Sequence, residues 1–578
     1  MKKNVLIFLL LFFLLFVFPL WIRPLISPDE VRHAEIAREM IANSDYVSPS
    51  LNGMKYFEKP VMGYWIFACA QNLFGENAFA MRLPVALAAG CCAWIVFLLG
   101  RRYAGGSRIG LLAAGIYLTM PMVFLLASVA IPEGLFTCFL TACLALFFYA
   151  SSDPGAVRWK KNLFLFCSGI LAGSAFLTEG FAGFALPVIV AVPYLIWEKR
   201  WKEIFILPWL PLLGALCIVL PWALLIHRAE ADFWRYFIVE GDLLRFLGGK
   251  GVGMIQDLLG CELIPGGNVW EMNAPHQEPF YFFFPVLLVG AGQWVLLFPV
   301  IGAGLKQIGW EGRFLRYCVC SAVLPFLFFS ISAGKLPSYL LPCFAPLALL
   351  SALGLYKSVI SGHHVRYLNV LCLALGGALL LAGVGFSIHE FTGFPAGEVL
   401  FRRGELWKWL LMMIACVMCA LILVLSCSER DSWKKILYFM LAFVPAILAS
   451  YLVMPESVVE RKSPSVLIAS VRPVLPAGVL LVSYRHPFQA LCWEFRRDDV
   501  WIFLRPGELE YGLRSPDQSQ RLLDLEAFRV LVEKNRGDPG VLLVLPCEQY
   551  AELRGKLPDG PAWVRGPENK DGYQLVAY

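Results

Sequence analysis

Residues 4–22 read NVLIFLLLFFLLFVFPLWI, and a charged stretch that begins at Arg23 follows at once. A helix that crosses a bilayer needs about 20 mostly apolar residues, so this segment is long enough to span one. Lys2 and Lys3 precede it, as in a secretory signal, but no small-residue cleavage site follows. We therefore expect the segment to be retained as a membrane anchor.

Twelve more apolar segments follow, so the sequence predicts thirteen transmembrane helices. They lie near 83–100, 108–128, 133–150, 163–178, 182–197, 204–226, 279–303, 316–333, 337–356, 367–388, 406–427 and 436–454. The 578 residues are 58% hydrophobic and only 16% charged, whereas soluble chains are about 45–50% apolar and roughly 25% charged. This composition excludes a soluble enzyme, a disordered chain and a nucleic-acid binder.

Lysine and arginine are distributed unevenly between the loops, which predicts the orientation of the chain. With the N-terminus in the cytoplasm, the short inside loops hold clusters such as Arg101-Arg102, Lys160-Lys161 and Lys434-Lys435. The short outside loops hold only Lys335, Arg402 and Arg403. We therefore expect the N-terminus inside, and an odd number of spans then places the C-terminus outside, in the periplasm.

The composition changes at about residue 455, where charges and turn residues return. Residues 1–454 are predicted to form the membrane domain, and residues 455–578 a small α/β domain. Predicted strands are Val479–Tyr484, Val500–Leu504 and Val541–Leu545, and predicted helices are Leu522–Glu533 and Glu548–Leu557.

Two outside loops, residues 23–82 and 227–278, are too long to serve only as connections. The first contains SPDEVRHAE at 27–35, which is typical of a helix start. Ser27 is the expected N-cap and Glu30 would close a capping box, so Glu30 is predicted to be structural. Asp29 has no part in that box, and a carboxylate at the membrane mouth is costly unless it is used.

Ionisable residues from several separate loops are predicted to face the same outer side of the membrane. They are Asp29, Glu58, Lys59, Glu133, Glu179, Arg245, His276 and Lys335. Ionisable groups at membrane depth are functional candidates by default, and their coincidence on one face predicts an active site there.

These motifs carry a resemblance to a known family. The sequence Pro-Asp-Glu-x-Arg after a retained first span resembles GT-C glycosyltransferases of the protein O-mannosyltransferase type. Tyr-Phe-Glu-Lys-Pro at 56–60 and Gly-Lys-Leu-Pro-x-Tyr at 334–339 resemble, more narrowly, the lipid A aminoarabinose transferases. The resemblance implies a GT-C fold of about thirteen helices with a periplasmic C-terminal α/β domain, in a bacterial inner membrane.

The resemblance also implies roles for individual residues. The catalytic group would be Asp29, Arg32 and Glu133. The donor phosphate would be held by Lys59, Arg245, Tyr339 and Lys335, and Glu179 would face the acceptor. A divalent metal ion of unknown identity would bind at Glu58, with Glu240, Asp242 and His276 as possible further ligands.

The chain departs from the family pattern at three places. Leu-Thr-Lys-Gly reads Leu-Thr-Glu-Gly at 177–180, so Glu179 replaces a lysine, and a Glu-His motif reads Glu-Gly-Asp at 240–242. Residues 247–275 form an insertion. The first two changes leave the identity of the acceptor and the presence of a metal undecided. Lys59 and Arg245, the residues expected to bind the donor phosphate, are retained.

The implied activity is an inverting transfer of a sugar from a polyprenyl (undecaprenyl) phosphate to an envelope acceptor on the periplasmic side. The acceptor is either a phosphate of lipid A in lipopolysaccharide or a hydroxyl of another glycan or protein. The alternatives are a ligase or polymerase of lipid-linked oligosaccharides, a lipid transporter or flippase, and a non-enzymatic envelope protein.

Overall fold

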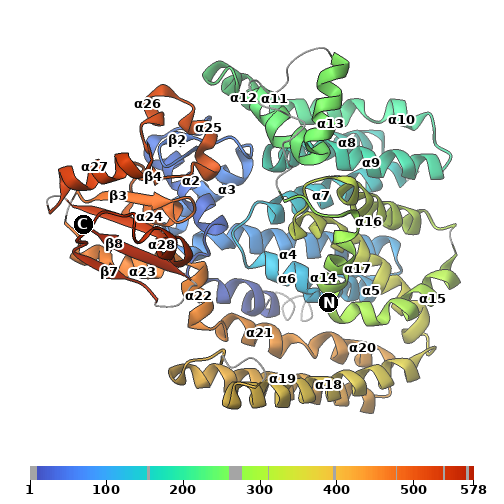
Figure 1. Ribbon diagram of the computed structural model, residues 1–578. Coiled ribbons are helices and arrows are strands. Elements are labelled where there is room, and N and C mark those ends of the chain that lie inside the picture. Colours follow the sequence, from blue (N-terminus) through green and yellow to red (C-terminus); the bar gives the residue numbers. More distant parts are fainter. Residues whose placement is uncertain are drawn as a thin grey trace.

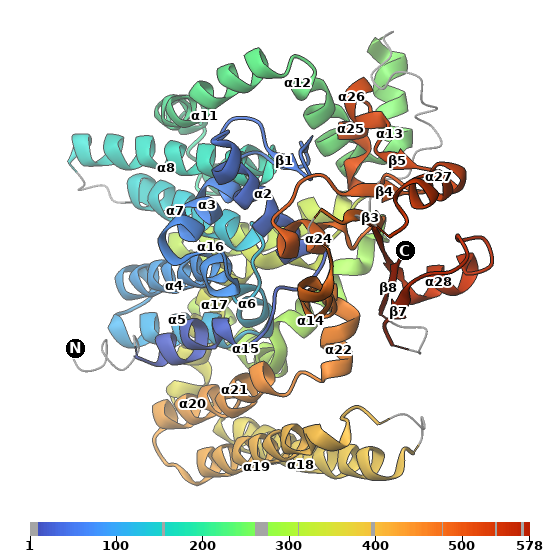
Figure 2. The same cartoon turned by 90° about the vertical axis from the view of Figure 1, so that its left-hand side faces the viewer.

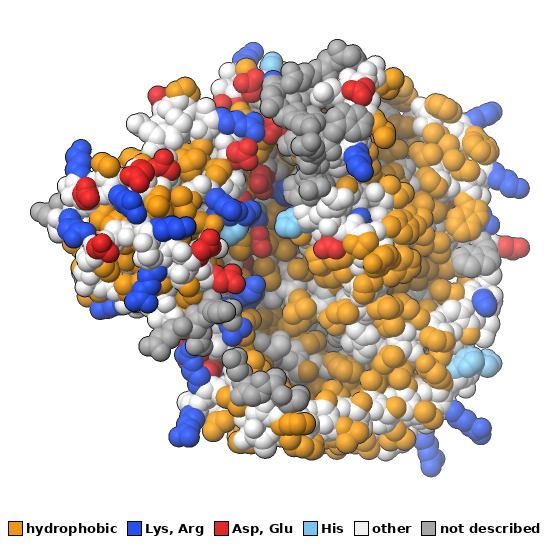
Figure 3. Space-filling model, in the orientation of Figure 1, with side chains coloured by type: hydrophobic (Ala, Val, Ile, Leu, Met, Phe, Trp, Pro, Cys, Tyr) orange, Lys and Arg blue, Asp and Glu red, His pale blue; other side chains and the backbone are white. Residues whose placement is uncertain are grey.

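The computed structural model describes residues 10–152, 157–259, 276–309, 311–394, 399–476, 478–537, 540–567 and 572–578. A large bundle of helices carries a smaller domain with a β-sheet at one end (Figures 1 and 2). We call this the outer end, because the loop of residues 23–82 lies there. Hydrophobic side chains gather over the helical part, whereas charged side chains are dense over the sheet domain (Figure 3).

Ten helices in the described part of the chain are long and apolar enough to cross a membrane. They contain α4 (Ala78–Tyr103), α7 (Glu133–Ser152), α8 (Arg158–Glu179), α10 and α11 (Glu203–Ile206, Trp209–Ala229), α14 and α15 (Phe283–Ala291, Phe298–Ile308), α16 (Arg313–Ile331), α17 (Leu341–Leu355), α18 (Val365–Thr392), α19 (Leu406–Ser428), and α20 and α21 (Ser432–Leu441, Val444–Leu452). The protein is therefore a multi-span membrane protein.

Three more predicted spans correspond to shorter or broken helices. The segment predicted at 108–128 is the pair α5 (Ser107–Thr119) and α6 (Pro121–Ala127), bent by 66° at the break. Pro121 explains the break, because it has no backbone N–H to continue the hydrogen-bond ladder. Two shorter apolar helices occupy Leu10–Trp21 and α9 (Ala182–Trp197). The count of thirteen spans stays a prediction.

Small residues allow some of these helices to approach closely. Gly169 and Gly173 on α8 face α11, where a Cβ on Gly169 would lie 1.9 Å from the carbonyl oxygen of Pro211. Gly214 on α11 makes the reciprocal approach, because a Cβ there would lie 2.2 Å from the carbonyl oxygen of Phe166. Such close backbone packing is what joins helices in lipid, where apolar side chains gain little by leaving the lipid tails.

Helix ends that flank four of the loops predicted to be cytoplasmic contact one another in pairs. The Arg102 guanidinium stacks over the ring of Tyr149 at 4.6 Å. Arg316 Nη1 lies 3.0 Å from Glu198 Oε1, which joins the end of α9 to the start of α16. These contacts place helix ends that the sequence assigns to the same side of the membrane next to each other, and the orientation of the chain stays a prediction.

At the outer end, helix α2 (Asp29–Asn43) is fixed by a buried ion pair. Arg82 donates to both carboxylate oxygens of Glu30 at 2.7 and 2.6 Å, and the backbone N–H of Ala130 donates to Glu30 at 2.8 Å. The predicted capping box is wrong: Pro28 is the N-cap, and Ser27 Oγ is buried without a partner in the described part of the chain. Glu30 therefore has the predicted structural role, but it acts through its ion pair with Arg82 and not through a capping box.

The C-terminal domain has a six-stranded sheet in the order β5-β4-β3-β6-β8-β7. The strands are β3 (Leu480–Tyr484), β4 (Trp501–Phe503), β5 (Leu522–Leu523), β6 (Val541–Pro546), β7 (Trp563–Arg565) and β8 (Tyr573–Ala577). β5, β4, β3 and β6 are parallel, while β8 is antiparallel to β6 and β7. The three predicted strands are confirmed.

The two helices predicted in this domain begin at different residues in the structure. The predicted helix Leu522–Glu533 begins instead with the edge strand β5, and α27 (Leu525–Asn535) follows it. The Asp524 side chain caps α27 by accepting from the N–H of Ala527 at 2.8 Å. The second predicted helix is α28 (Cys547–Leu553).

The sheet domain is attached to the outer loop by a buried polar contact. The Asn52 side chain donates to the carbonyl of Val500 at 2.8 Å and accepts from its N–H at 2.9 Å. Arg521 adds a hydrogen bond to the Asn52 side chain at 2.9 Å. These bonds hold the start of β4 against the loop of residues 23–82.

Glu30→Gln should destabilise the protein, because it leaves the Arg82 charge buried and unpaired. Burial by itself raises the pKa of Glu30, but the Arg82 hydrogen bonds and charge outweigh it and hold the pKa below its usual value. Breaking a buried pair costs about 3–5 kcal/mol. Thermal unfolding in detergent, followed by tryptophan fluorescence, measures the loss.

The matched control is Glu460→Gln, which also removes a carboxylate from a two-bond arginine pair. Glu460 binds Arg402 at 2.9 and 2.7 Å, but both side chains are well exposed. Exposed pairs contribute about 0–1 kcal/mol. Equal losses of stability in the two variants would contradict a supporting role for the Glu30–Arg82 pair.

Candidate active site

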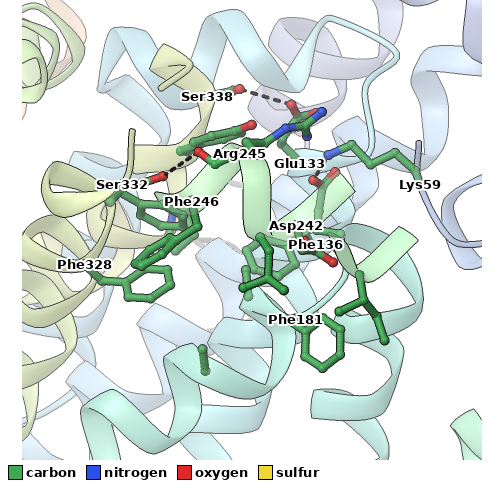
Figure 4. Close-up of a pocket in the computed structure, with 18 residues that line it drawn as sticks. Lys59, Glu133, Phe136, Phe181, Asp242, Arg245, Phe246, Phe328, Ser332 and Ser338 are labelled. Atoms are coloured by element: carbon green, nitrogen blue, oxygen red, sulfur yellow. Dashed lines mark hydrogen bonds and ion pairs between the residues drawn. The ribbon is translucent and has the colours of Figure 1, made fainter. Parts of the chain in front are cut away.

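A cavity of about 400 Å³ opens between the outer ends of the helices (Figure 4). Ionisable groups lie at one end, where Lys59, Glu133 and Arg245 point toward one another, and aromatic rings form other walls (Figure 4). The lining residues include Lys59, Glu133, Phe136, Glu179, Phe181, Asp242, Arg245, Phe246, Phe328, Phe329, Ser332, Ser338 and Tyr339. Apolar walls beside a charged end suit a lipid that carries an ionic headgroup.

Lys59 reaches the cavity from the outer loop and donates a hydrogen bond to Glu179 Oε2, at the end of α8. The Lys59 and Glu179 side chains are only 17% and 7% exposed. Burial by itself lowers the pKa of Lys59, but the Glu179 carboxylate outweighs this effect and raises it. Lys59 therefore carries its charge in the cavity.

Arg245 lies at the same end of the cavity, and its Nε has no hydrogen-bond partner among the described residues. Burial by itself lowers the pKa of Arg245, but Tyr339 and the carboxylate of Glu58 raise it above its ordinary value. Glu58 accepts a hydrogen bond from the Tyr56 hydroxyl at 2.9 Å. The structure thus brings the predicted residues Lys59, Arg245 and Tyr339 to one place.

Asp242 lines the same cavity from the segment before α13 (Leu244–Leu259). It packs against the turn between α8 and α9, where a Cβ on Gly180 would lie 2.9 Å from Asp242 Oδ2. Gly180 also has φ +79°, a conformation that other residues rarely adopt. Burial raises the pKa of Asp242 to about 6, against opposing effects of Arg245 and Lys59.

Glu133 and Ser338 join two further elements at the cavity. Ser338 Oγ donates to Glu133 Oε1 at 3.1 Å, from the short turn before α17 to the start of α7. Glu133 was predicted from the sequence, whereas Ser338 was not. Its position beside Tyr339 in the Gly-Lys-Leu-Pro-Ser-Tyr motif is the signal that could have found it.

Asp29 and Arg32 lie in a second polar group, at the contact with the C-terminal domain. Arg32 donates to Asp29 at 2.7 Å and to Glu508 of that domain at 2.6 Å. Asp29 is 59% exposed, while Arg32 and Glu508 are largely buried. No sequence pattern indicated Glu508, because its contact with Arg32 joins residues 476 positions apart.

Lys335 does not line the cavity. Lys335 is 4% exposed, and its ammonium group donates to the backbone carbonyls of Glu278, at 2.8 Å, and Ser332. The backbone N–H of Lys335 also donates to the carbonyl of His276 at 2.9 Å. Lys335 therefore fixes the turn that precedes α17, and its contact with the donor phosphate stays a prediction.

The proposed metal ligands do not form one group in the structure. Glu240 binds Arg514 of the C-terminal domain at 3.2 Å and lines a separate cavity of about 420 Å³. Asp242 faces the first cavity, and His276 is exposed. Within the described ranges, no cluster of three or more His, Cys, Asp or Glu residues could hold a metal.

The fold is that of a GT-C glycosyltransferase, and comparison with known structures agrees. The crystal structure titled ArnT from Cupriavidus metallidurans bound to undecaprenyl phosphate matches with a TM-score of 0.79 at 21% identity, covering 100% of this chain and 98% of that one. Family models match too: dolichyl-phosphate-mannose-protein mannosyltransferase at residues 1–237, and the C-terminal domain of arabinosyl transferase ArnT at 459–567.

Whole-chain relatives are undecaprenyl phosphate-alpha-4-amino-4-deoxy-L-arabinose arabinosyl transferases. The one from Edwardsiella ictaluri is 36% identical over 98% of this chain and 97% of its own length. The one from Erwinia tasmaniensis is 34% identical over 96% of each. The chain belongs to this family of arabinosyl transferases and is a glycosyltransferase. This membership decides against the transporter, ligase and non-enzymatic alternatives.

Asp242→Asn should change the pH dependence of stability. The pKa of Asp242 is about 6 in the folded protein and 3.8 for an ordinary aspartate. Between these pH values the folded protein therefore binds more protons at this carboxyl than the unfolded chain does. The stability of the wild type should therefore fall as pH rises from about 4 to 6 and stay lower above that. The neutral amide lacks this penalty, so the variant should unfold at a higher temperature than wild type at pH 8, and the gap should close at pH 4.

The exposed Asp257→Asn on α13 is the control and should track the wild type at both pH values. Thermal unfolding in one detergent, buffered at pH 4 and pH 8, measures the difference. A gap of the same size at both pH values would show that the Asp242 charge is not the cause.

Proposed function

We propose that the protein transfers 4-amino-4-deoxy-L-arabinose from undecaprenyl phosphate to a phosphate group of lipid A, on the periplasmic face of a bacterial inner membrane. We infer the donor from the names of the relatives. The main structural support for this donor is the charged end of the apolar cavity. Lys59 and Arg245 there present two half-buried cations beside walls that suit a polyprenyl chain.

In this mechanism the donor phosphate binds Lys59 and Arg245. The acceptor attacks the anomeric carbon from the face opposite the phosphate, so the C–O bond to the phosphate breaks as the new bond forms and the centre inverts. The departing undecaprenyl phosphate gains negative charge, and the two cations stabilise that charge in a site of low dielectric. Tyr339 lies beside both cations and orients them.

The structure gives Glu179 a partner other than the acceptor. A glutamate in place of a lysine favours a hydroxyl or an amine as acceptor, because an anionic phosphate would be repelled. However, one oxygen of Glu179 is hydrogen-bonded to the Lys59 ammonium, which offsets part of the negative charge that an acceptor phosphate would meet. A lipid A phosphate is therefore compatible with this site.

Asp29 and Arg32 serve the acceptor side in this proposal. A phosphate acceptor is already an anion and needs no general base, so Asp29 positions groups through Arg32 rather than removing a proton. Arg32 also provides a cation that Glu508 and Asp29 hold in place.

Mass spectrometry of lipid A tests the proposed function. A deletion strain should lack the amino sugar on its lipid A phosphates, and the cloned gene should restore it. Lipid A that is unchanged in the deletion strain, together with an altered envelope glycan, would instead support a hydroxyl acceptor and overturn the lipid A assignment.

Lys59→Ala should lower transfer from the lipid-linked donor much more than Lys59→Arg, which keeps the charge. A charge-assisted contact contributes about 1.5–3 kcal/mol, so the loss should be about 10–150-fold. Membranes that contain each variant, labelled donor and lipid A provide the assay. Lys55→Ala is the control, because Lys55 lies in the same loop but pairs with Glu230 outside the cavity. Wild-type turnover by Lys59→Ala would contradict a phosphate role for Lys59.

The proposal requires the outer end of the bundle to face the periplasm, with the N-terminus in the cytoplasm. A reporter enzyme that is active only in the periplasm, fused after Tyr578, should therefore be active. A reporter that is active only in the cytoplasm should be silent at the same position. The opposite pattern would place the cavity on the cytoplasmic side and would contradict transfer to an acceptor on the periplasmic face.

A further inference from the structure

The cavity has more carboxylates than cations. Glu133, Glu179 and Asp242 face two cations, Lys59 and Arg245, so the lining carries one more negative than positive charge when all are ionised. A site that bound only a phosphate would be expected to have the opposite excess. The carboxylates therefore need a second reason to be there.

One oxygen of each carboxylate is buried without a hydrogen-bond partner. These atoms are Glu133 Oε2, Glu179 Oε1 and Asp242 Oδ2, judged against the described part of the chain. The Glu179 side chain is only 7% exposed. Buried acceptors without donors are costly, and native proteins contain few of them. Three in one cavity indicate a ligand that supplies several N–H or O–H donors.

Each of the three carboxylates is also held by a contact with a neighbouring residue. Lys59 donates to Glu179 Oε2 and Ser338 donates to Glu133 Oε1, while Asp242 packs against Gly180. These contacts fix the three side chains in place, so the remaining oxygens present a preformed set of acceptors. Among the residues whose positions are described, no group of three or more acidic, His or Cys side chains could hold one metal ion.

We propose that these three carboxylates form a subsite for a protonated amine on the donor sugar, with Glu179 as the residue that determines specificity. This inference rests on the proposed function. An ammonium group supplies a positive charge and three N–H donors, whereas a hydroxyl supplies one donor and no charge. The donor headgroup would be zwitterionic, with its phosphate toward Arg245 and Lys59 and its amine toward the carboxylates. Its charges then complement both sets of side chains.

The test compares two undecaprenyl phosphate donors that differ only at one group of the sugar. One carries 4-amino-4-deoxy-L-arabinose and the other carries L-arabinose, in which a hydroxyl replaces the amine. The wild type in membranes should show a kcat/KM for the amino sugar at least about 10-fold higher, the value of one charged hydrogen bond. Glu179→Gln should reduce this ratio by about 10-fold or more, mainly by slowing transfer of the amino sugar.

The ratio of two donors in one membrane preparation does not depend on how much of a variant folds. Asp242→Asn is the second variant and should also lower the ratio. The matched control is Glu198→Gln, because Glu198 is another buried glutamate paired with a cation, 5% exposed, but at the opposite end of the bundle. It should keep the wild-type ratio.

Several outcomes would overturn the amine subsite. Equal kcat/KM for the two donors in the wild type would do so while leaving the proposed function intact. A ratio unchanged in Glu179→Gln, or equal losses for both donors, would show that Glu179 acts only by holding Lys59. Transfer of neither sugar by the wild type would overturn the proposed function as well as the subsite.

Discussion

The buried guanidinium of Arg82 is the interaction on which the outer end of the molecule depends. It binds Glu30 through both oxygens and also donates to the carbonyls of Leu20, Arg23 and Pro24. One side chain at the start of α4 thus ties the end of the first apolar helix to the beginning of α2. A charge so deeply buried is tolerated only because every donor finds an acceptor, so the geometry of this junction has little freedom.

The position of the cavity follows from that junction. The outer loop runs from α2 through a short hairpin of β1 (Ser50–Leu51) and β2 (Met54–Lys55) to Lys59, so α2 determines where Lys59 can reach. Asn52, in the turn of this hairpin, is hydrogen-bonded to Val500, which directly precedes strand β4 of the C-terminal sheet. The sheet domain also supplies Glu508 to Arg32 on α2. The domain therefore supports the site from outside the membrane, although it does not line the cavity.

The sequence predicts most of the fold because a bilayer leaves few choices: its apolar segments must be helices, and their lengths are set by its thickness. It also predicts that Lys59, Glu133, Glu179 and Arg245 share one face. It could not predict their partners. Ser27 and Glu30 have the spacing of a capping box, yet the Glu30 carboxylate binds Arg82, because a buried guanidinium is a stronger partner than the backbone N–H of Ser27. Lys335 has the motif of a phosphate ligand, yet its ammonium group is used by two carbonyls, a contact that sequence spacing does not encode.

The pairing of Lys59 with Glu179 has a consequence for how the site works between turnovers. A lysine that is buried alone tends to lose its proton, because desolvation disfavours the charged form. The Glu179 carboxylate removes that penalty, so Lys59 is already an ammonium when a phosphate arrives. The arriving anion must then share Lys59 with Glu179, and the carboxylate regains stabilisation only if a new cation comes with the phosphate. A cavity built this way favours a headgroup that carries both charges over one that carries only the negative charge.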